Sequence, residues 1–234
     1  MKGNDVSAPT LSKREGEEKD LMFLLDKPKE YTSARIVNII KKTLNVKKAG
    51  HAGTLDPKAT GLMIICTGKK TKTLNELLGS DKEYEGIMII GEKTKSFDSE
   101  TEVYETNTVS HLTEEFIKVA ASGFIGEIKQ IPPMYSAVKH KGKPLYKFAR
   151  KGKELERKPR NVIIKEFEIT SVKLPDVNFR VLCSKGTYIR SLVNDLGEKL
   201  GVGAYLKELR RTKIGQYDIK HSITLEQFFE TYRN

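Results

Sequence analysis

Short apolar runs recur along the chain and are typical of buried strands. The clearest of them occupy residues 21–25, 62–66 and 86–90. Each has the length of a strand rather than of a helix. Cys66 and Cys183 also end strand-like runs, so we expect two buried, reduced packing cysteines and no disulfide framework.

Helical spacing appears between these runs. Ser33 is expected to cap a helix whose apolar face consists of Ile36, Val37, Ile40 and Leu44. Further helices are predicted around residues 74–78, around residues 116–120 with a stop at Gly123, and after a capping box at residues 224–227 whose neighbours Ile223 and Phe228 are placed for a hydrophobic staple. Strands and helices interleave irregularly, which favours an α+β fold around a mixed sheet.

Residues 1–20 differ from the rest because they are polar and nearly free of large apolar side chains. They are expected to form a disordered tail, followed by a single domain over residues 21–234. The sequence contains neither an apolar leader nor a run of about 18 apolar residues. We therefore expect a soluble, cytoplasmic protein without a membrane partner.

The charge changes the picture, because 42 Lys and Arg outnumber 31 Asp and Glu and give a net charge of +11. Such an excess favours a polyanionic partner, nucleic acid first. It is concentrated in residues 139–160, where Glu154 and Glu156 oppose ten cations: Lys139, Lys141, Lys143, Lys147, Arg150, Lys151, Lys153, Arg157, Lys158 and Arg160.

Aromatic side chains interleave with these cations, which suits phosphates and unstacked bases. Tyr146 and Phe148 are the aromatic residues of the segment, within a short helix that Pro144 is expected to start and Gly152 to end. The simpler interpretation, an exposed helix with solvated charges, stays open at this point.

Asp56 is the first candidate for chemistry, because it lies in a constrained turn between apolar segments. Gly53, Pro57 and Gly61 flank it, and the proline restricts its backbone to extended conformations. An isolated Asp-Pro would more simply be a turn residue that caps the next segment. No metal-ligand spacing and no nucleotide-binding loop accompany it, so neither a metal nor a cofactor is expected.

Six ordered motifs between about Leu21 and Gly215 resemble the TruB family of tRNA pseudouridine synthases. The catalytic motif is GHAGTLDPKATGLMIICTGKKTK, from Gly50 onward. The others are Leu25-Asp-Lys-Pro28, Asp81-Lys-Glu-Tyr84, Gln130 to Lys139 with Gly142 to Tyr146, Cys183 to Arg190 with Asp195 to Gly201, and Glu208-Leu-Arg-Arg211. The resemblance implies the pseudouridine synthase catalytic fold, with a largely antiparallel mixed sheet flanked by helices and a basic thumb insertion at about residues 126–160.

The resemblance also implies the reaction and the residues that carry it. Uridine would be isomerised in place, with Asp56 as the one catalytic carboxylate; direct attack on C1′ and removal of a ribose proton both stay open. Arg190 would pair with Asp56 and orient it through a two-pronged contact. The remaining support would come from Tyr84 stacking on the base, Tyr188 as a second aromatic wall, Leu209 as the apolar floor, and Lys27 near the first motif.

The implied partner is the T-arm of tRNA, with the target at uridine 55 in tRNA convention. His51 would enter the space that the flipped nucleotides vacate. RNA phosphates would be held by Lys139, Lys141, Lys143, Lys147, Arg150 and Lys151. A monomer is expected.

The match departs from the family at two places. Residues 29–31 read Lys-Glu-Tyr, where relatives often carry a glycine, so this loop is expected to differ in shape. Many relatives continue into a PUA-type RNA-binding domain, whereas this sequence ends at Asn234, so the thumb is expected to carry more of the binding. A catalytically silent RNA-binding or RNA-folding protein and a nucleic-acid glycosylase that uses Asp56 as its nucleophile are the two alternatives.

Overall fold

The structure is a computed structural model that describes residues 19–232. Its strands are β1 (Met22–Lys27), β2 (Ala49–His51), β3 (Thr60–Thr67), β4 (Lys82–Ile90), β5 (Glu92–Thr94), β6 (Val103–Thr106), β7 (Gly126–Gln130), β8 (Lys139–His140), β9 (Lys143–Pro144), β10 (Arg160–Lys173), β11 (Asp176–Cys183), β12 (Ala204–Ile214) and β13 (Tyr217–Asp218). Its helices are α1 (Ser33–Thr43), α2 (Leu74–Gly79), α3 (Glu114–Ser122), α4 (Tyr146–Ala149), α5 (Ile189–Lys199) and α6 (Leu225–Tyr232), with 3-10 turns η1 (Gly68–Thr73) and η2 (Ile219–His221).

A nine-stranded sheet organises the fold. Its order is β1-β3-β12-β4-β11-β10-β7, with β2 paired to β3 and β13 paired to β12. β3 and β12 run parallel, while the other paired neighbours of this sheet are antiparallel. This confirms the prediction of an α+β fold with a mixed, largely antiparallel sheet.

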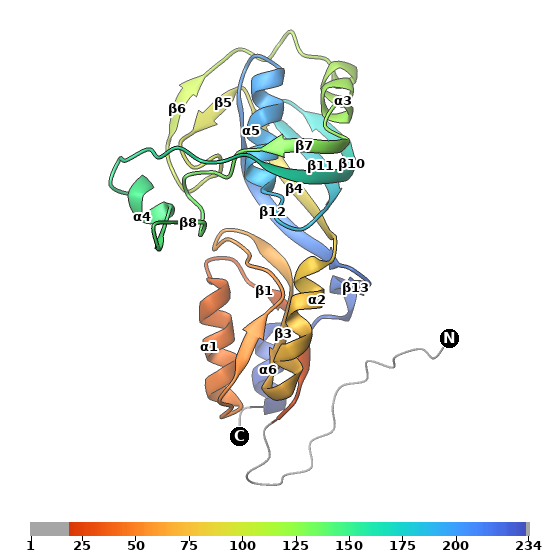
Figure 1. Ribbon diagram of the computed structural model, residues 1–234. Coiled ribbons are helices and arrows are strands. Elements are labelled where there is room, and N and C mark those ends of the chain that lie inside the picture. Colours follow the sequence, from red (N-terminus) through yellow and green to blue (C-terminus); the bar gives the residue numbers. More distant parts are fainter. Residues whose placement is uncertain (1–18, 233–234) are drawn as a thin grey trace.

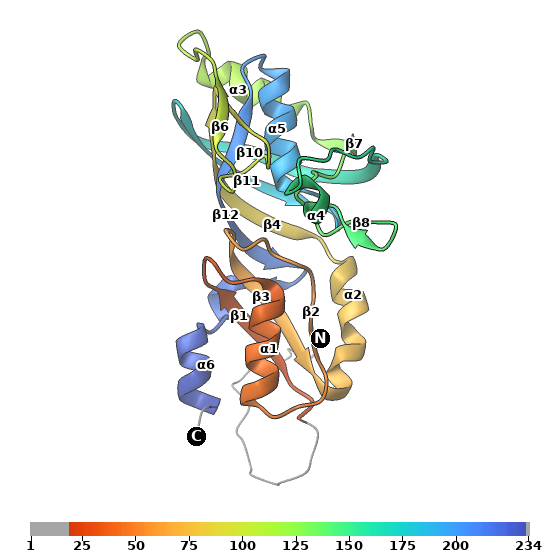
Figure 2. The same ribbon diagram turned by 90° about the vertical axis from the view of Figure 1, so that its left-hand side faces the viewer.

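The two long strands β4 and β12 join an upper and a lower half of the molecule (Figure 1, Figure 2). The lower half holds β1, β2 and β3 with α1, α2 and α6, and the upper half holds β7, β10 and β11 with α3 and α5. Between the halves, residues 53–56 of the loop from β2 to β3 share a cavity with residues 186–190 at the start of α5. The site therefore lies where elements far apart in sequence meet.

β3 explains how the lower half is built, because both of its faces are buried. Met63 and Ile65 belong to the main core, whereas Leu62, Ile64 and Cys66 face a second, smaller core. A strand covered on both sides needs a continuous apolar run, which is what the sequence has at this point. In the upper half, β11 instead alternates buried and half-buried residues, as expected of a strand with one face toward solvent.

The last helix is capped at the predicted residue, whereas the cap of the first helix lies one residue earlier than predicted. Thr224 and Gln227 form the predicted capping box, with the Thr224 Oγ1 atom accepting from the Gln227 N–H at 3.2 Å and the Gln227 Oε1 atom accepting in return at 2.9 Å. The cap of α1 is Thr32, not Ser33, because the Thr32 hydroxyl accepts from the N–H of Arg35. Ser33 is buried in the first turn, so its hydroxyl is available for another partner.

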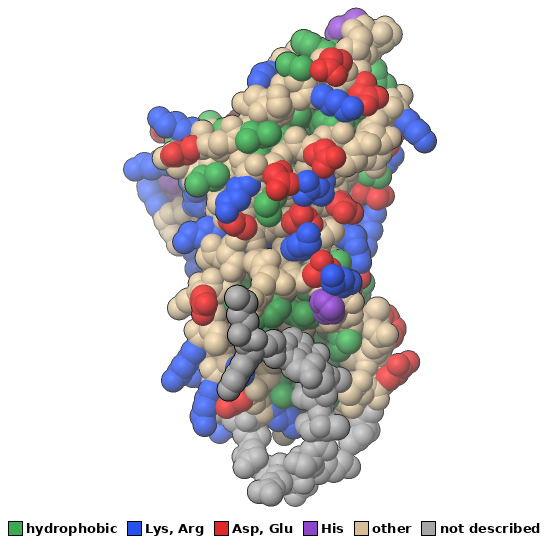
Figure 3. Space-filling view, turned by 90° about the vertical axis from the view of Figure 1, so that its right-hand side faces the viewer, with side chains coloured by type: hydrophobic (Ala, Val, Ile, Leu, Met, Phe, Trp, Pro, Cys, Tyr) green, Lys and Arg blue, Asp and Glu red, His purple; other side chains and the backbone are tan. Residues whose placement is uncertain are grey.

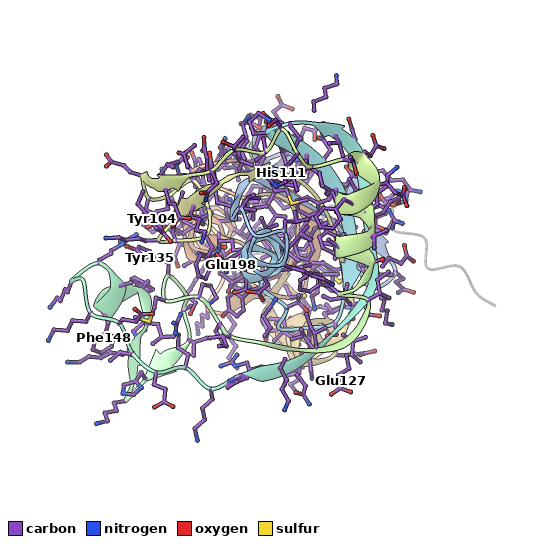
Figure 4. The ribbon with its side chains drawn as sticks, turned by 90° about the horizontal axis from the view of Figure 1, so that it is seen from above. Tyr104, His111, Glu127, Tyr135, Phe148 and Glu198 are labelled. Carbon is purple, nitrogen blue, oxygen red and sulfur yellow. The ribbon has the colours of Figure 1, made fainter. Side chains whose placement is uncertain are left out.

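The basic segment leaves the sheet between β7 and β10 and projects to one side as the thumb, residues 131–159 (Figure 1). The prediction began the thumb at about residue 126, but residues 126–130 form β7 and pair with β10. Pro144 does not start a helix; it lies in β9, and α4 begins two residues later. Seen from above, Phe148 lies on the projecting part and Tyr135 lies between it and the body (Figure 4).

The opposite side of the molecule carries mixed charge, with acidic and basic side chains interspersed (Figure 3). On the exposed face of the upper sheet, for example, Arg180 forms ion pairs with Glu83, Glu166 and Glu168. Cations here have acidic neighbours, whereas most of those on the thumb do not. The side of the molecule with free positive charge is therefore the thumb side.

Three predictions concern the chain as a whole. The expected tail, residues 1–20, falls largely outside the described residues; of residues 19 and 20, the carboxylate of Asp20 accepts from the Lys69 N–H at 2.6 Å. Cys66 and Cys183 are free and buried, as predicted. Within residues 19–232, no helix is both long enough and apolar enough to cross a bilayer.

Gly61 offers a direct test of how β3 is joined to β12. Its φ is +108°, and a Cβ atom added there would lie 2.4 Å from the Arg211 carbonyl oxygen. Backbone atoms cannot move aside as a flexible side chain can, so Gly61→Ala should lower the free energy of unfolding by more than about 1 kcal/mol. Thermal unfolding should then shift down by at least about 2–4 °C for a chain of this size.

Gly79→Ala is the matched control, because no atom lies within 4 Å of a Cβ built at Gly79. That position closes α2, so its melting temperature should stay the same or rise slightly. Equal melting temperatures for Gly61→Ala and the native protein would contradict the close approach of β3 and β12.

Candidate active site

The loop that carries Asp56 is held from below by two buried side chains. The Ser33 hydroxyl accepts from the Leu55 N–H at 2.9 Å and donates to the Leu55 carbonyl at 3.0 Å. The ammonium group of Lys27 donates to the Pro57 carbonyl at 3.2 Å. Both residues that flank Asp56 are thus fixed, and its carboxylate is left 40% exposed. The loop presents one acidic group to the space above it.

Arg190 supplies the charge that faces Asp56. It is the second residue of α5, and its side chain is 4% exposed. The Nε atom lies 3.0 Å from the Oδ2 atom of Asp56, as an ion pair without the geometry of a hydrogen bond. A buried cation at a helix N-terminus is unfavourable on its own, so the nearby carboxylate offsets a real cost.

The expected two-pronged contact with Asp56 is wrong, because the guanidinium is shared between two carboxylates. Its Nη1 atom lies 3.3 Å from the Oδ2 atom of Asp98, whose side chain is 9% exposed. Burial raises the pKa of Asp98, and the charge of Arg190 opposes that rise. Asp98 was not predicted as a site residue, because no sequence pattern around it distinguishes it from an ordinary turn residue.

Two carbonyl oxygens complete the setting of Arg190. Its Nη2 atom donates to the Tyr135 carbonyl at 2.9 Å, and its Nη1 atom donates to the Ser96 carbonyl at 3.3 Å. Tyr135 belongs to the thumb, so the thumb contributes directly to the position of the arginine. Arg190 thereby links three separate parts of the chain: the Asp56 loop, the β5–β6 connection and the thumb.

A cavity of about 290 Å³ opens in front of the Asp56 carboxylate. Of the residues predicted for the site, Asp56, Tyr84, Tyr188, Arg190 and Leu209 all line it. Tyr84 is 8% exposed, and burial raises its phenol pKa. A cavity with aromatic and apolar residues beside a carboxylate can hold a planar ring and expose one face of its sugar to the acid.

Tyr188 is placed in this cavity by a side chain from β7. The Gln130 amide accepts from the Tyr188 N–H at 2.7 Å and donates to the Tyr188 carbonyl at 3.0 Å. Both backbone groups at the start of α5 are therefore satisfied within the protein. Burial raises the pKa of the Tyr188 phenol, which stays neutral near pH 7.

Lys27 and His51 lie near the site but do not line this cavity. Lys27 is fully buried and also donates to the Pro28 and Tyr31 carbonyls, so it fastens the 28–31 loop to the loop of Asp56. Burial lowers its pKa to about 8, although the nearby Asp56 charge raises it. His51 is half-buried on β2, and burial lowers its pKa too.

Two cations in the cavity wall were missed by the sequence reading. Arg211 is 1% exposed, and Lys82 is 6% exposed. Each stands two residues from a predicted site residue on the same strand, Arg211 from Leu209 on β12 and Lys82 from Tyr84 on β4. Alternation along a strand places such pairs on one face, and this signal could have found both.

The thumb cations predicted to bind RNA are exposed: Lys139, Lys141, Lys143, Lys147, Arg150 and Lys151. Arg150 also pairs with Glu100 at 2.8 Å and lies over the Tyr146 ring at 5.5 Å. Glu100 follows Asp98 in the β5–β6 connection, so this contact ties the thumb to the carboxylate cluster. Within residues 19–232, no group of three or more His, Cys, Asp or Glu side chains is placed to hold a metal ion.

Comparison with protein families places this sequence in a known group. The N-terminal domain of TruB family pseudouridylate synthases matches residues 41–189, and the C-terminal domain of tRNA pseudouridylate synthase B matches residues 190–234. A tRNA pseudouridine synthase B of Flavobacterium johnsoniae is 48% identical over 217 residues, covering 90% of this chain and 95% of that protein. That of Chloroherpeton thalassium is 50% identical, covering 89% of this chain and 88% of the relative.

Solved structures agree with these matches. The structure titled as a Cbf5-Nop10-Gar1 complex contains a chain with a TM-score of 0.70 and 34% identity. A second, titled as an H/ACA RNP bound to a substrate RNA containing 2′-deoxyuridine, gives a TM-score of 0.69 and 32% identity. The match covers 90% of this chain and about half of each of those longer chains, 54% and 53%. The chain belongs to the TruB family of pseudouridine synthases.

Proposed function

We propose that this chain is a tRNA pseudouridine synthase that converts uridine 55 of the T-loop into pseudouridine. The observation that carries the proposal is the carboxylate of Asp56, ion-paired with buried Arg190 at the edge of a cavity with aromatic and apolar walls. The chain's high identity with proteins named tRNA pseudouridine synthase B supports the same reaction and substrate.

Asp56 is the group that acts on the ribose. The bond between N1 of the base and C1′ of the sugar breaks, the base turns, and C5 forms the new bond to C1′. Either the carboxylate attacks C1′, or it removes a ribose proton and leaves a glycal; both routes need an ionised carboxylate near the sugar. The ion pair with Arg190 at 3.0 Å limits the directions in which the carboxylate can point.

Asp98 acts on the reaction through Arg190. With a single carboxylate partner, the guanidinium could swing toward Asp56 and neutralise it more completely. Shared between Asp56 and Asp98, it stays between the two and leaves one oxygen of Asp56 free for the substrate. We therefore assign Asp98 as a positioning residue.

The target uridine must leave the stacked T-loop, because a carboxylate in a cavity cannot reach C1′ within folded RNA. Extrusion costs a few kcal/mol, and stacking against Tyr84 offsets part of it. Tyr188 and Leu209 close the remaining sides, and we propose that His51 and the thumb cations hold the RNA that surrounds the emptied position. Action as a monomer stays a prediction.

Asp56→Asn should abolish pseudouridine formation while leaving the fold intact. Removing the group that reacts should cost about 10⁴-fold or more in the single-turnover rate. The measurement is mapping of pseudouridine in an unmodified tRNA transcript, together with the mass of the RNA. Isomerisation leaves that mass unchanged, whereas a glycosylase would release uracil.

Asp176→Asn is the control for this variant, because Asp176 pairs with Lys207 at the surface and lies outside the cavity. It should keep the native rate. Equal rates for Asp56→Asn and the native protein would contradict the assignment of Asp56. A native protein that forms no pseudouridine in the T-loop would contradict the function.

Asp98→Asn should lower the single-turnover rate by on the order of 100-fold, the effect expected when a reacting group is misplaced by about 1 Å. tRNA affinity should not change, because Asp98 is buried behind Arg190. Rate and affinity are measured on the same tRNA transcript. A loss of affinity with an unchanged rate would show that Asp98 has no positioning role.

The thumb assignment predicts a change in salt dependence. Replacing Lys147, Arg150 and Lys151 with alanine should weaken tRNA binding and flatten the plot of log affinity against log salt by roughly one unit per lost phosphate contact. Equal replacement of Lys118, Lys173 and Lys199, which are exposed on α3, β10 and α5 and lie outside residues 131–159, should leave the slope unchanged. Identical slopes for the two triple variants would remove the thumb assignment.

A further inference from the structure

Two buried cations, Arg211 and Lys82, line the cavity beside Gly53, where an added Cβ atom would lie 3.5 Å from the Arg211 Nη1 atom and 3.9 Å from the Lys82 Cε atom. Lys27, His51 and Lys82 each have a lowered pKa, with burial as the main cause and the charge of Arg211 as a further cause in every case. For Lys82 the pKa falls to about 8. Acidic neighbours oppose this lowering only in part: Asp56, Glu30 and Asp26 raise the pKa of Lys27, and Asp81 raises that of Lys82.

Arg211 is the centre of this cluster and has no ion-pair partner among the described residues. Its Nε atom donates to the Leu62 carbonyl at 2.8 Å, and its Nη2 atom donates to the Gly53 carbonyl at 3.1 Å. Its remaining contact is with the Tyr84 phenol, across the β4–β12 pair. An arginine that is 1% exposed and meets only neutral groups is costly to keep.

Lys82 also has no ion-pair partner among the described residues. Its ammonium group donates to the Leu77, Leu78 and Ser80 carbonyls at 3.4, 2.8 and 2.6 Å. These bonds use its three N–H groups, so Lys82 affects the cavity through its charge rather than by contact. Arg190 differs, because two carboxylates already balance it.

The location of the two cations indicates which anion they suit. Both are buried in the wall of the cavity that Tyr84 also lines, whereas Arg160 lines the same cavity but is exposed. Backbone phosphates of a bound RNA stay near solvent, where Arg160 and the thumb can reach them. A negative charge next to Arg211 and Lys82 must be carried by the group that stacks in the cavity, which is the base itself.

The reaction generates such a charge. When the C1′–N1 bond breaks, its electron pair leaves with the base, so uracil becomes a monoanion with charge shared among N1, O2 and O4. C5 then bonds to C1′ and loses its proton, and N1 gains one, so uridine and pseudouridine keep the same formula. Donors aimed at a charge that appears only during the reaction lower its barrier.

Building on the proposed function, we propose that Arg211 is a second catalytic residue, which stabilises the detached uracil anion with Lys82 as electrostatic support. Asp56 then acts on the sugar side of the broken bond, and Arg211 acts on the base side. Neutral uridine gains little from either cation, so their effect falls on the rate of bond cleavage rather than on RNA affinity.

The test compares Arg211→Met with the native protein on two T-arm RNAs, one with uridine and one with 5-fluorouridine at the target position. Fluorine withdraws electrons and stabilises the departing base without help from the protein. Loss of one such donor should lower the single-turnover cleavage rate on uridine by about 100- to 1000-fold. The loss on 5-fluorouridine should be smaller, and the salt slope of binding should be unchanged.

Lys82→Met repeats the comparison in case Arg211→Met unfolds the loop of Gly53, and it should give a smaller loss with the same dependence on fluorine. Equal losses on the two RNAs would show a structural role and overturn the proposal. Weaker binding with a flatter salt slope would assign the cations to a phosphate and overturn it as well. Native protein that leaves uridine unchanged would overturn the proposed function and this inference together, whereas the other two results leave the function standing.

Discussion

The site depends on one buried guanidinium held between two carboxylates. Arg190 reaches Asp56 at 3.0 Å and Asp98 at 3.3 Å, and its Nη1 and Nη2 atoms each donate to a carbonyl oxygen. Removing this cation would leave a buried carboxylate at Asp98 and an unoriented one at Asp56, which is the costly way to break such a cluster. Arg190 can therefore orient the Asp56 carboxylate only when the Asp56 loop, the β5–β6 connection and the thumb are all in their native positions.

Charge is divided across the cavity in a way that matches the chemistry of the family. In the proposed reaction, a carboxylate balanced by Arg190 faces the sugar, and two cations without an ion-pair partner among the described residues face the base. The sheet makes this division possible, because β4 and β12 carry Tyr84, Lys82, Leu209 and Arg211 on one face and β3 supplies the loop of Asp56. A rigid sheet keeps these charged groups at fixed positions relative to a bound substrate, which a flexible loop could not do.

Much of the fold was predictable, because local patterns determine it. The apolar run of β3, the strand at residues 86–90 and the capping box of α6 were each read from short stretches. The local pattern gave wrong predictions where tertiary contacts determine the structure. Ser33 does not cap α1 because its hydroxyl bonds to the backbone of Leu55, and Pro144 does not start a helix because it lies in a hairpin of the thumb. The resemblance supplied the pairing of Asp56 with Arg190, whereas Asp98 became visible only when the β5–β6 connection was placed beside them.

The central claim is that Asp56, oriented by Arg190, meets the sugar of an everted uridine. The most direct measurement is the distance from the residue 56 side chain to C1′ in a crystal structure of the Asp56→Asn variant bound to a T-arm RNA. The account predicts about 3 to 3.5 Å, the separation of a reactive arrangement, with the base against Tyr84. A target uridine that stays stacked in its loop, or a side chain at position 56 that faces away from the ribose, would contradict it.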